Sequence, residues 1–233
     1  MCGRFTQYNH RRLLARLHQL GLDEDDIDSP YYNLSPSQLI LAVRRVIDHN
    51  EIARLRWGLI PSWAKDTSIG YKTINARCET IHEKPAFRSA FKHRRCLIPA
   101  DGFYEWKQVK PKTPYFVYRA DKEPMVFAGL WESWTSPEGE IIESCSIVTT
   151  EASEIIKPLH ERMPVMVEPE NFERWLDPAI TTREKLEDLF LTPPSQLLAL
   201  HPVSALVNSP RNQGPALIEA VEEPTQQGSL FPD

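Results

Sequence analysis

The second residue of the chain is a cysteine, and its position allows chemistry that no internal cysteine can perform. The sequence begins with Met1, Cys2, Gly3 and Arg4. If Met1 is removed, Cys2 carries an α-amine and a thiol on adjacent carbons. An α-amine has a reference pKa of about 7.7–8.0, so a useful fraction is neutral at physiological pH. A neutral amine can attack a carbonyl carbon to form a Schiff base, and the neighbouring thiol can then add to the same carbon.

Three internal segments also carry polar residues that could take part in chemistry. Asn75 and Arg77 lie in "INARCET", Glu105 lies in "DGFYEW", and His160 and Arg162 lie in "LHERMPV". A carboxylate among aromatic residues is costly unless it is paired or working. Each residue also has an ordinary explanation as a surface charge or a partnered polar side chain. The spacing by itself does not establish that they meet.

The remaining cysteines are not arranged for metal binding or disulfide formation. Cys78, Cys96 and Cys145 are widely spaced and form no CxxC pair, whereas a structural zinc site needs closely spaced ligand pairs. The first residues, "MCGRFTQYNHRR", have no apolar segment behind their charges, so no signal peptide is visible, and no apolar run approaches the ~20 residues that span a bilayer. We therefore expect reduced cysteines, no metal and no cofactor, and a cytoplasmic location without membrane contact, near the nucleoid if the source is bacterial.

The charge of the chain is unevenly distributed. The net charge is −5, yet residues 1–119 hold 20 Lys and Arg against 12 Asp and Glu, and the remainder holds 7 against 20. Local charge matters more than net charge for docking a phosphate backbone. The asymmetry permits a nucleic-acid-binding face in the first half, and it is also compatible with an unevenly charged, solvated surface.

The elements that must position these residues are mostly strands. Leu13, Leu14, Leu17 and Leu20 form one stripe, and Gly21 is a suitable stop, which predicts a helix over 10–20. An acidic loop should follow over 23–38. Apolar runs separated by turn-forming residues predict strands at 39–47, 52–60, 96–100, 102–107, 114–119, 125–133, 141–150 and 197–203. Short helices are expected at 79–87, 171–176 and 182–190.

This pattern predicts an α+β fold with mainly antiparallel strands and flanking helices. We expect one domain over residues 1–207, from which Met1 is removed in the mature protein. Residues 208–233 are rich in Pro, Gln and Glu and are expected to form a flexible polar tail. We expect a monomer.

Several long motifs resemble one known family. "MCGRF", "WGLIPSWAKD", "INARCET", "RRCLIPADGFYEW", "FAGLWE" and "LHERMPV" closely resemble, in this order, the SOS-response-associated peptidase (SRAP) family. The resemblance runs from Cys2 to about His201. It implies a single SRAP domain with a barrel-like core that captures abasic sites in single-stranded DNA covalently.

The chemistry of Cys2 fits this implied substrate. An abasic deoxyribose opens to an aldehyde, which the α-amine can convert to a Schiff base. Addition of the thiol then closes a five-membered thiazolidine, with the advantage of an intramolecular step. Serine or alanine could form the imine but not this ring. The imine also acidifies the adjacent sugar carbon, so some abasic-site lyase activity is expected.

The resemblance also assigns roles to residues around Cys2. It implies that Asn75 holds the Cys2 backbone and amine. Glu105 resembles the family's proton-transfer carboxylate, in formation of the crosslink and in its reversal, and its aromatic neighbours could raise its pKa. His160 resembles the group that assists opening of the sugar ring.

Further residues are candidates for contacts with the DNA strand. The resemblance implies that Arg4, Arg77 and Arg162 contact the phosphates on either side of the lesion. Trp63 is a weaker candidate for stacking against a base or sugar, and an ordinary loop aromatic is an equally good explanation.

The end of the chain contains a short motif. Gln227, Leu230 and Phe231 fit a Q-x-x-L-F pattern that resembles the peptide with which bacterial replication proteins bind the sliding clamp. A plain polar tail is the alternative. The hypothesis is that the tail brings the protein to replication forks.

Two alternative functions are compatible with the same residues. Cys2 could be the N-terminal nucleophile of a cysteine peptidase or amidohydrolase, with Glu105 or His160 as the base, whose action could be limited to removal of Met1. The chain could also bind modified bases or single strands without covalent chemistry. The basic first half favours the DNA-binding functions over the peptidase.

Overall fold

Five strands of the chain close into a small barrel. In the computed structural model, which describes residues 2–22, 30–108 and 112–223, they pair in the order β10, β4, β3, β6, β9 and back to β10. The strands are β3 (Leu39–Val46), β4 (His49–Trp57), β6 (Arg95–Ala100), β9 (Met125–Thr135) and β10 (Ile141–Glu151). Only the β4–β10 pair in this ring is parallel. The expected barrel-like, mainly antiparallel core is confirmed.

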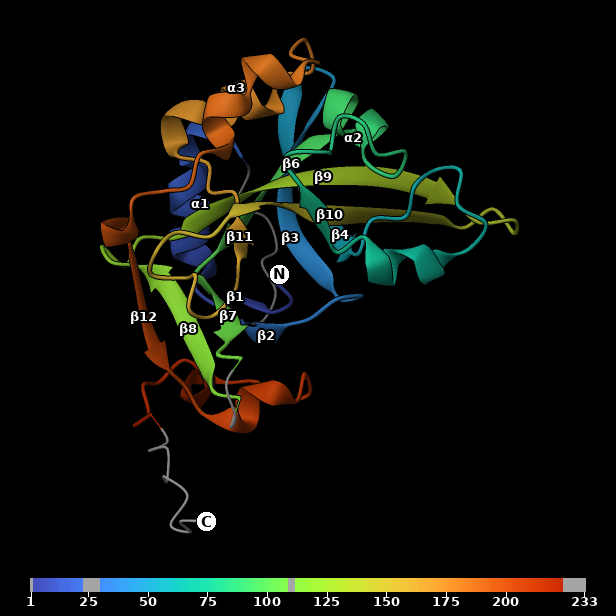
Figure 1. The fold of residues 1–233 in the computed structure, drawn as a ribbon. Coiled ribbons are helices and arrows are strands. Elements are labelled where there is room, and N and C mark those ends of the chain that lie inside the picture. Colours follow the sequence, from blue (N-terminus) through green and yellow to red (C-terminus); the bar gives the residue numbers. More distant parts are fainter. Residues whose placement is uncertain (1, 23–29, 109–111, 224–233) are drawn as a thin grey trace, which may run out of the picture.

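A second sheet packs beside the barrel (Figure 1), and it is antiparallel throughout. Its strands, in spatial order, are β12 (Leu198–Pro202), β8 (Pro114–Arg119), β7 (Gly102–Trp106), β1 (Phe5–Gln7) and β2 (Tyr31–Leu34). Phe5 makes edge contacts with Trp57 of the barrel and Phe127 of β9, at ring-centroid distances of 5.1 and 6.1 Å. The two sheets therefore share one apolar core.

One buried side chain joins the two sheets by hydrogen bonds. The Gln7 amide donates to the carbonyl oxygens of Leu41 and Pro99, both at 2.8 Å, and accepts from the Leu41 N–H at 2.9 Å. Gln7 is 1% exposed, and unpaired amide groups at that depth would be costly. Gln7 thus fixes β1, and the N-terminal residues before it, against the barrel.

Two short strands flank β10 and carry site residues. β5 (Asn75–Arg77) runs parallel to β10, and β11 (Arg162–Pro164) runs antiparallel to it. Both strands have only three residues, so their position depends on pairing with the longer strand rather than on local preference. The end of β10 is therefore the frame on which the site is assembled.

Short helices cover the outside of the barrel. They are α1 (His10–Leu17), α2 (Arg88–His93) and α3 (Phe172–Leu176). Leu13, Leu14, Leu17 and Leu20 are buried, and Gly21 takes a left-handed conformation with φ 65°, as the sequence predicts. In Figure 1, α2 and α3 lie at one end of the molecule, away from β2 and β8. Within the described ranges, no helix has the length and apolar character required to cross a membrane.

Among the described residues, the other helical segments are short 3₁₀ helices, most of them a single turn. Their bounds are Thr67–Lys72, His18–Leu20, Pro169–Asn171, Arg183–Lys185, Glu187–Phe190, Ser195–Leu197, Ala205–Asn208 and Pro215–Leu217. The helix predicted over 182–190 is therefore two separate turns. The helix predicted over 79–87 is a series of turns, and α2 begins only at Arg88.

The predicted loop over 23–38 contains a strand. Tyr31–Leu34 forms β2, where it pairs with β1 and buries Asn33 and Leu34. The Asn33 amide donates to the backbone oxygens of Ser209 and Asn212 at 2.9 and 3.0 Å. Long-range pairing, which local composition does not reveal, makes this segment a strand.

The packed chain continues beyond the domain boundary expected at residue 207. Val203 pairs with Ala220, the Val221 N–H donates to the Pro202 carbonyl oxygen at 3.0 Å, and Leu217 is 2% exposed. Residues 208–221 cover Tyr104 on the outer face of the second sheet, where Figure 1 shows them in red. Residues 208–221 are mostly polar, but the apolar side chains of Leu217 and Ile218 pack against the second sheet and hold the segment in place.

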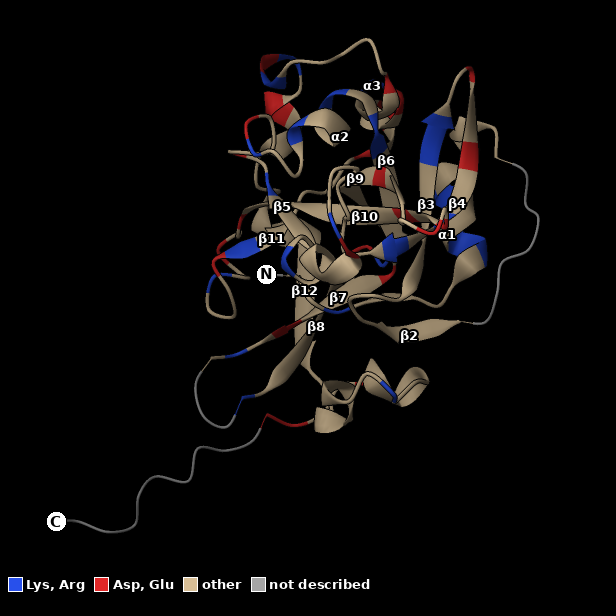
Figure 2. Cartoon of the chain, turned by 90° about the vertical axis from the view of Figure 1, so that its right-hand side faces the viewer, with Lys and Arg blue, Asp and Glu red and all other residues tan. Residues whose placement is uncertain are grey.

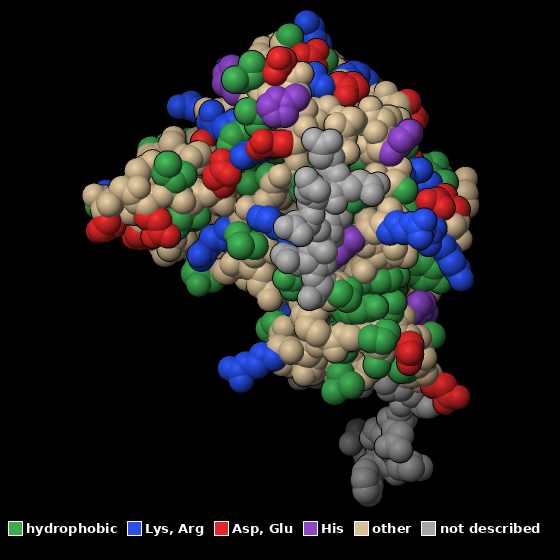
Figure 3. Space-filling view, turned by 180° about the vertical axis from the view of Figure 1, so that it is seen from behind, with side chains coloured by type: hydrophobic (Ala, Val, Ile, Leu, Met, Phe, Trp, Pro, Cys, Tyr) green, Lys and Arg blue, Asp and Glu red, His purple; other side chains and the backbone are tan. Residues whose placement is uncertain are grey.

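The positive charge of the first half does not form an uninterrupted patch. On β3 and β4, Arg44 pairs with Glu51 and Glu143, both at 2.6 Å, and Figure 2 shows Lys and Arg beside acidic residues on these strands. The face in Figure 3 likewise mixes the two signs. Several further cations of the first half also pair with carboxylates of the second half, so the charge asymmetry along the sequence does not by itself define a binding face.

Candidate active site

Cys2 lies buried at the edge of the shared core. Its side chain is 0% exposed, and it packs in the same apolar cluster as Phe5, Phe103 and Met163. Burial raises the pKa of the Cys2 thiol well above its usual value, and the Glu105 carboxylate raises it further, while the positive amino terminus acts in the opposite direction. The thiol is therefore protonated at neutral pH, and a base must take its proton for it to act as a nucleophile.

Asn75 holds the backbone of Cys2. Its Nδ2 donates to the Cys2 carbonyl oxygen at 2.8 Å. β5 is fixed on β10 by the pairing of Asn75 with Ile147, and Asn75 is 9% exposed. Its Oδ1 is buried and has no hydrogen-bond partner among the described residues. An acceptor oxygen therefore lies in the same amide group that fixes Cys2.

Glu105 faces Cys2 from the adjacent strand. Phe5 of β1 pairs with Phe103 of β7 in antiparallel register, so Glu105 lies opposite the residues that precede β1. Side chains alternate along a strand, so Glu105 shares the inward face of Phe103. It is 4% exposed. Burial raises the pKa of Glu105 to about 7 in the chain that still carries Met1, although the positive amino terminus of that chain and a backbone hydrogen bond from Trp106 lower it.

A pKa of about 7 suits the Glu105 carboxyl group to proton transfer. A carboxyl group that is half protonated near pH 7 can both donate and accept protons under physiological conditions. The direction of this shift is the one that the aromatic neighbours of Glu105 suggest, and desolvation is its main cause.

His160 lies in the connection between β10 and β11, and a backbone contact defines its tautomer. Its Nδ1 accepts a hydrogen bond from the Arg162 N–H at 2.9 Å. The neutral ring therefore carries its proton on Nε2. Burial lowers the pKa of His160, and the positive amino terminus lowers it further. At neutral pH this histidine is an uncharged hydrogen-bond donor.

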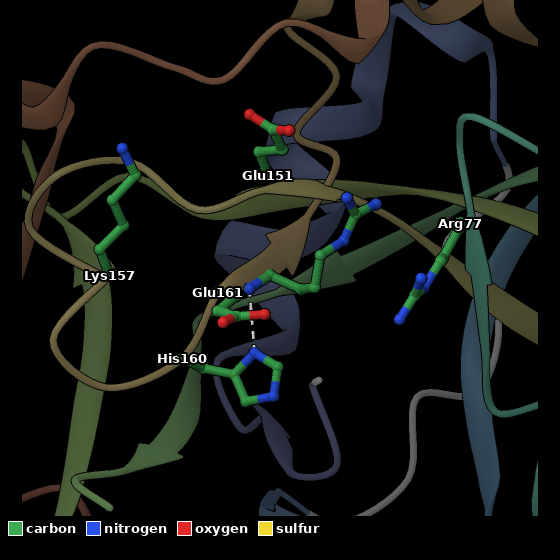
Figure 4. Close-up of a pocket in the computed structure, with 6 residues that line it drawn as sticks. Arg77, Glu151, Lys157, His160 and Glu161 are labelled. Carbon is green, nitrogen blue, oxygen red and sulfur yellow. Dashed lines mark hydrogen bonds between the residues drawn. The ribbon is translucent and has the colours of Figure 1, made fainter.

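Two surface cavities meet at His160. The larger, of about 710 Å³, is lined by Arg77, Glu151, Lys157, His160, Glu161 and Arg162. Figure 4 shows Arg77 and His160 on opposite sides of this cavity, with Arg77 on the strand that also carries Asn75. The second, of about 430 Å³, is lined by Glu105, Trp106, Gln108, Lys112, His160 and Asn208. His160 and Glu105 are thus both reachable from the surface.

The structure adds one residue that the sequence did not single out. Glu79 forms a two-pronged ion pair with Arg162: Nη1 lies 2.7 Å from Oε1 and Nη2 lies 2.9 Å from Oε2. The segment "INARCET" contains Glu79, but only the return of the chain at β11 places Arg162 beside it. No local pattern in the sequence could have indicated the pair.

Arg4 and Trp63 lie outside both cavities. Arg4 Nη1 donates to Asn33 Oδ1 at 2.7 Å and to the Val207 carbonyl oxygen at 2.8 Å, so this guanidinium joins β1 to β2 and to the C-terminal segment. Trp63 is 59% exposed on a loop, and its Nε1 lies 3.4 Å from the Pro85 oxygen. The structure therefore places Arg77 and Arg162 in the lining of the larger cavity. Arg4 lies beside the second cavity, with its guanidinium 5.9 Å from the ring centre of Trp106, whereas Trp63 is in the lining of neither.

The remaining sequence candidates are the C-terminal motif and the three internal cysteines. Gln227, Leu230 and Phe231 lie outside the described residues. Cys78, Cys96 and Cys145 are free and buried.

The fold and site together define a class of protein. A closed barrel with a second sheet holds a cysteine at position 2 against an amide, a carboxyl group of pKa about 7 and a neutral imidazole. These are the groups that nucleophilic chemistry with proton transfer requires.

Comparison with known proteins identifies the family. The sequence profile of the SOS response associated peptidase (SRAP) family matches residues 1–210, and the chain belongs to this family. It is 43% identical to the abasic site processing protein YoqW of Bacillus subtilis, over 94% of this chain and 100% of that one. It is 34% identical to the abasic site processing protein HMCES of Xenopus tropicalis, over 85% of this chain and 68% of that one.

Solved structures share the fold. A protein of Bacteroides thetaiotaomicron superposes with a TM-score of 0.84 at 24% identity, over 95% of this chain and all of that one. A protein of Bordetella bronchiseptica gives a TM-score of 0.73 at 25% identity, over 87% of this chain and all of that one.

Proposed function

We propose that this protein captures abasic sites in single-stranded DNA by forming a thiazolidine crosslink through Cys2 after removal of Met1. The abasic-site-processing names of its relatives support this function. The observation that carries it is the geometry at Cys2, whose carbonyl is held by Asn75 at 2.8 Å beside a carboxyl group with a pKa of about 7.

The proposed reaction balances without a cofactor. The neutral Cys2 amine adds to the aldehyde carbon of the opened sugar, and Glu105 donates a proton to the hydroxyl that leaves as water. Loss of that water leaves a protonated iminium, whose nitrogen keeps one N–H. Glu105, now ionised, accepts the thiol proton while sulfur adds to the iminium carbon, and the electron pair of the C=N bond returns to nitrogen. Aldehyde and aminothiol thus give thiazolidine and one water molecule.

Asn75 and His160 have supporting roles in this proposal. The buried Asn75 Oδ1 can accept a hydrogen bond from the mature amine and orient its lone pair toward the sugar. The Nε2–H of neutral His160 donates to the ring oxygen as the sugar opens. Arg77 and Arg162 line the adjoining cavity and provide positive charge for the flanking phosphates.

Two further activities follow from the same intermediate. Elimination from the Schiff base gives abasic-site lyase activity in competition with ring closure. Addition of water to the reopened imine reverses the crosslink, with Glu105 again moving the proton. The peptidase alternative would use the same Cys2 thiol with the same candidate bases, and the abasic-site-processing names of the relatives favour the crosslinking function over it.

A denaturing gel tests the proposal. Protein lacking Met1 is mixed with a single-stranded oligonucleotide from which one uracil has been excised. A shifted band should form without reductant. It should be absent for Cys2→Ala and for a chain that retains Met1, and it should persist in the control Cys78→Ala. Cys2→Ser should give a band only after borohydride reduction. Absence of a band with the wild-type protein would refute the proposal.

We also propose that the motif at Gln227, Leu230 and Phe231 binds the replication sliding clamp. The support is the sequence pattern, with two apolar anchors in a polar segment. The test is fluorescence polarisation of a labelled peptide of residues 222–233 with purified clamp. Binding should be lost in Leu230→Ala and Phe231→Ala. Binding that is absent, or that survives both substitutions, refutes the idea.

A further inference from the structure

The guanidinium of Arg162 is already occupied by groups of the protein. Both Nη atoms donate to the Glu79 carboxylate, and Nη2 also donates to the Thr149 carbonyl oxygen at 2.6 Å. The Arg162 side chain is 12% exposed, whereas that of Glu79 is 45% exposed. Arginine has five N–H donors, and three of them are used here. The face that Arg162 presents to solvent is thus shared with a carboxylate.

A phosphate that approaches Arg162 must therefore approach Glu79 as well. The cavity beside them is not uniformly basic, because Glu151 and Glu161 line it together with Lys157 and Arg77. Burial raises the pKa of Glu79, but the hydrogen bonds and positive charge of Arg162, together with further local hydrogen bonds, lower it below its usual value, so its carboxylate is ionised at neutral pH. If Arg162 faces a phosphate, as in the proposed function, the Glu79 carboxylate repels that phosphate.

We infer that Glu79 is a specificity-determining residue that weakens the binding of undamaged single-stranded DNA by occupying the guanidinium of Arg162 with its own carboxylate. This inference rests on the proposed function, in which Arg162 faces a phosphate next to the lesion. Weak reversible binding lets the protein leave undamaged DNA, and retention at a lesion then depends on the covalent bond to Cys2. Selectivity then comes from the covalent reaction rather than from non-covalent contacts with the strand.

The test is the affinity of Glu79→Gln for an undamaged single-stranded oligonucleotide. Glutamine keeps an oxygen that accepts a hydrogen bond from Arg162 but removes the charge that repels phosphate. Two like charges about 5 Å apart near a protein surface repel appreciably, so we expect binding roughly three- to tenfold tighter than wild type. The plot of log affinity against log salt should also steepen by about 0.7, the value for one additional phosphate contact in a single strand.

Two matched variants control for net charge and for folding. Asp188→Asn removes a carboxylate from another two-pronged surface pair, in which Arg174 lies 2.6 Å from each Asp188 oxygen, and its affinity should remain at the wild-type value. Glu79→Asp keeps the charge and should remain within about twofold of wild type. Thermal melting of each variant confirms that the comparison is between folded proteins.

The outcomes separate this inference from the proposed function. If folded Glu79→Gln binds undamaged DNA no more tightly than wild type, or more weakly, Glu79 merely supports Arg162 and the inference is wrong. An equal gain for Asp188→Asn would also overturn it, because net charge alone would then explain the effect. The crosslinking gel is run in parallel: its failure with the wild-type protein refutes the proposed function, while the affinity comparison on undamaged DNA is read independently.

Discussion

The buried carboxyl group of Glu105 should make the protein less stable as the pH rises. Its pKa is 4.5 in an ordinary environment and about 7 in the folded protein. The folded state therefore binds this proton more tightly than the unfolded state. The contribution of protonated Glu105 to stability is fully present below pH 4.5 and is lost as the pH rises through 7. Each pH unit corresponds to about 1.36 kcal/mol, so the total loss is about 3 kcal/mol.

Glu105→Gln removes this titration. Between pH 5 and pH 8, the free energy of unfolding of the wild type should fall by about 2 to 3 kcal/mol more than that of the variant. Other titrating groups cancel in the comparison. The assay is urea unfolding at both pH values. Glu105→Ala serves as a second variant, and its free energy of unfolding must depend on pH in the same way as that of Glu105→Gln. The same substitution should slow crosslinking by roughly 10²- to 10⁴-fold, the usual contribution of a general acid or base.

One result would refute this reasoning. If wild type and Glu105→Gln lose the same stability between pH 5 and pH 8, the folded protein does not raise the pKa of Glu105. Its proposed role as a group that both donates and accepts protons near pH 7 would then lose its physical basis.

Three further substitutions test the frame around the site. Gln7→Ala removes the buried amide that joins the two sheets and should cost about 2 to 4 kcal/mol in urea unfolding; a cost below 0.5 kcal/mol would contradict that role. Gly102→Ala places a Cβ 2.4 Å from the Phe116 ring, and calorimetry should show a strongly lowered Tm. Asn75→Ala leaves the buried Cys2 carbonyl oxygen unpaired, costs about 1 to 3 kcal/mol, and should reduce the crosslinking rate at saturating DNA.

The local elements of the fold were largely predictable. The leucine stripe of α1 and its left-handed Gly21 follow from helical periodicity and the conformational freedom of glycine. The barrel strands follow from apolar runs bounded by turn-forming residues. The expected fold class is confirmed because these signals are short-range and each is strong by itself.

Elements whose structure depends on distant partners were missed. Tyr31–Leu34 is a strand because it pairs with β1. Residues 208–221 are packed because Leu217 lies against apolar side chains of the second sheet. The same limitation applies to the 3₁₀ turns at 183–185 and 187–190, where helical composition was overridden by the path of the chain. Composition cannot report partners that lie far away in sequence.

The sequence by itself determined which chemical groups are available: an aminothiol once Met1 is removed, an amide, a carboxyl group and an imidazole. Only the tertiary structure decided that Asn75 binds the Cys2 carbonyl oxygen, that Glu105 is desolvated to a pKa of about 7, and that Glu79 occupies Arg162. Residue types fix intrinsic reactivity, whereas distance, burial and neighbouring charge set pKa and orientation. These arise from strand pairings between segments far apart in the chain, which no local pattern encodes.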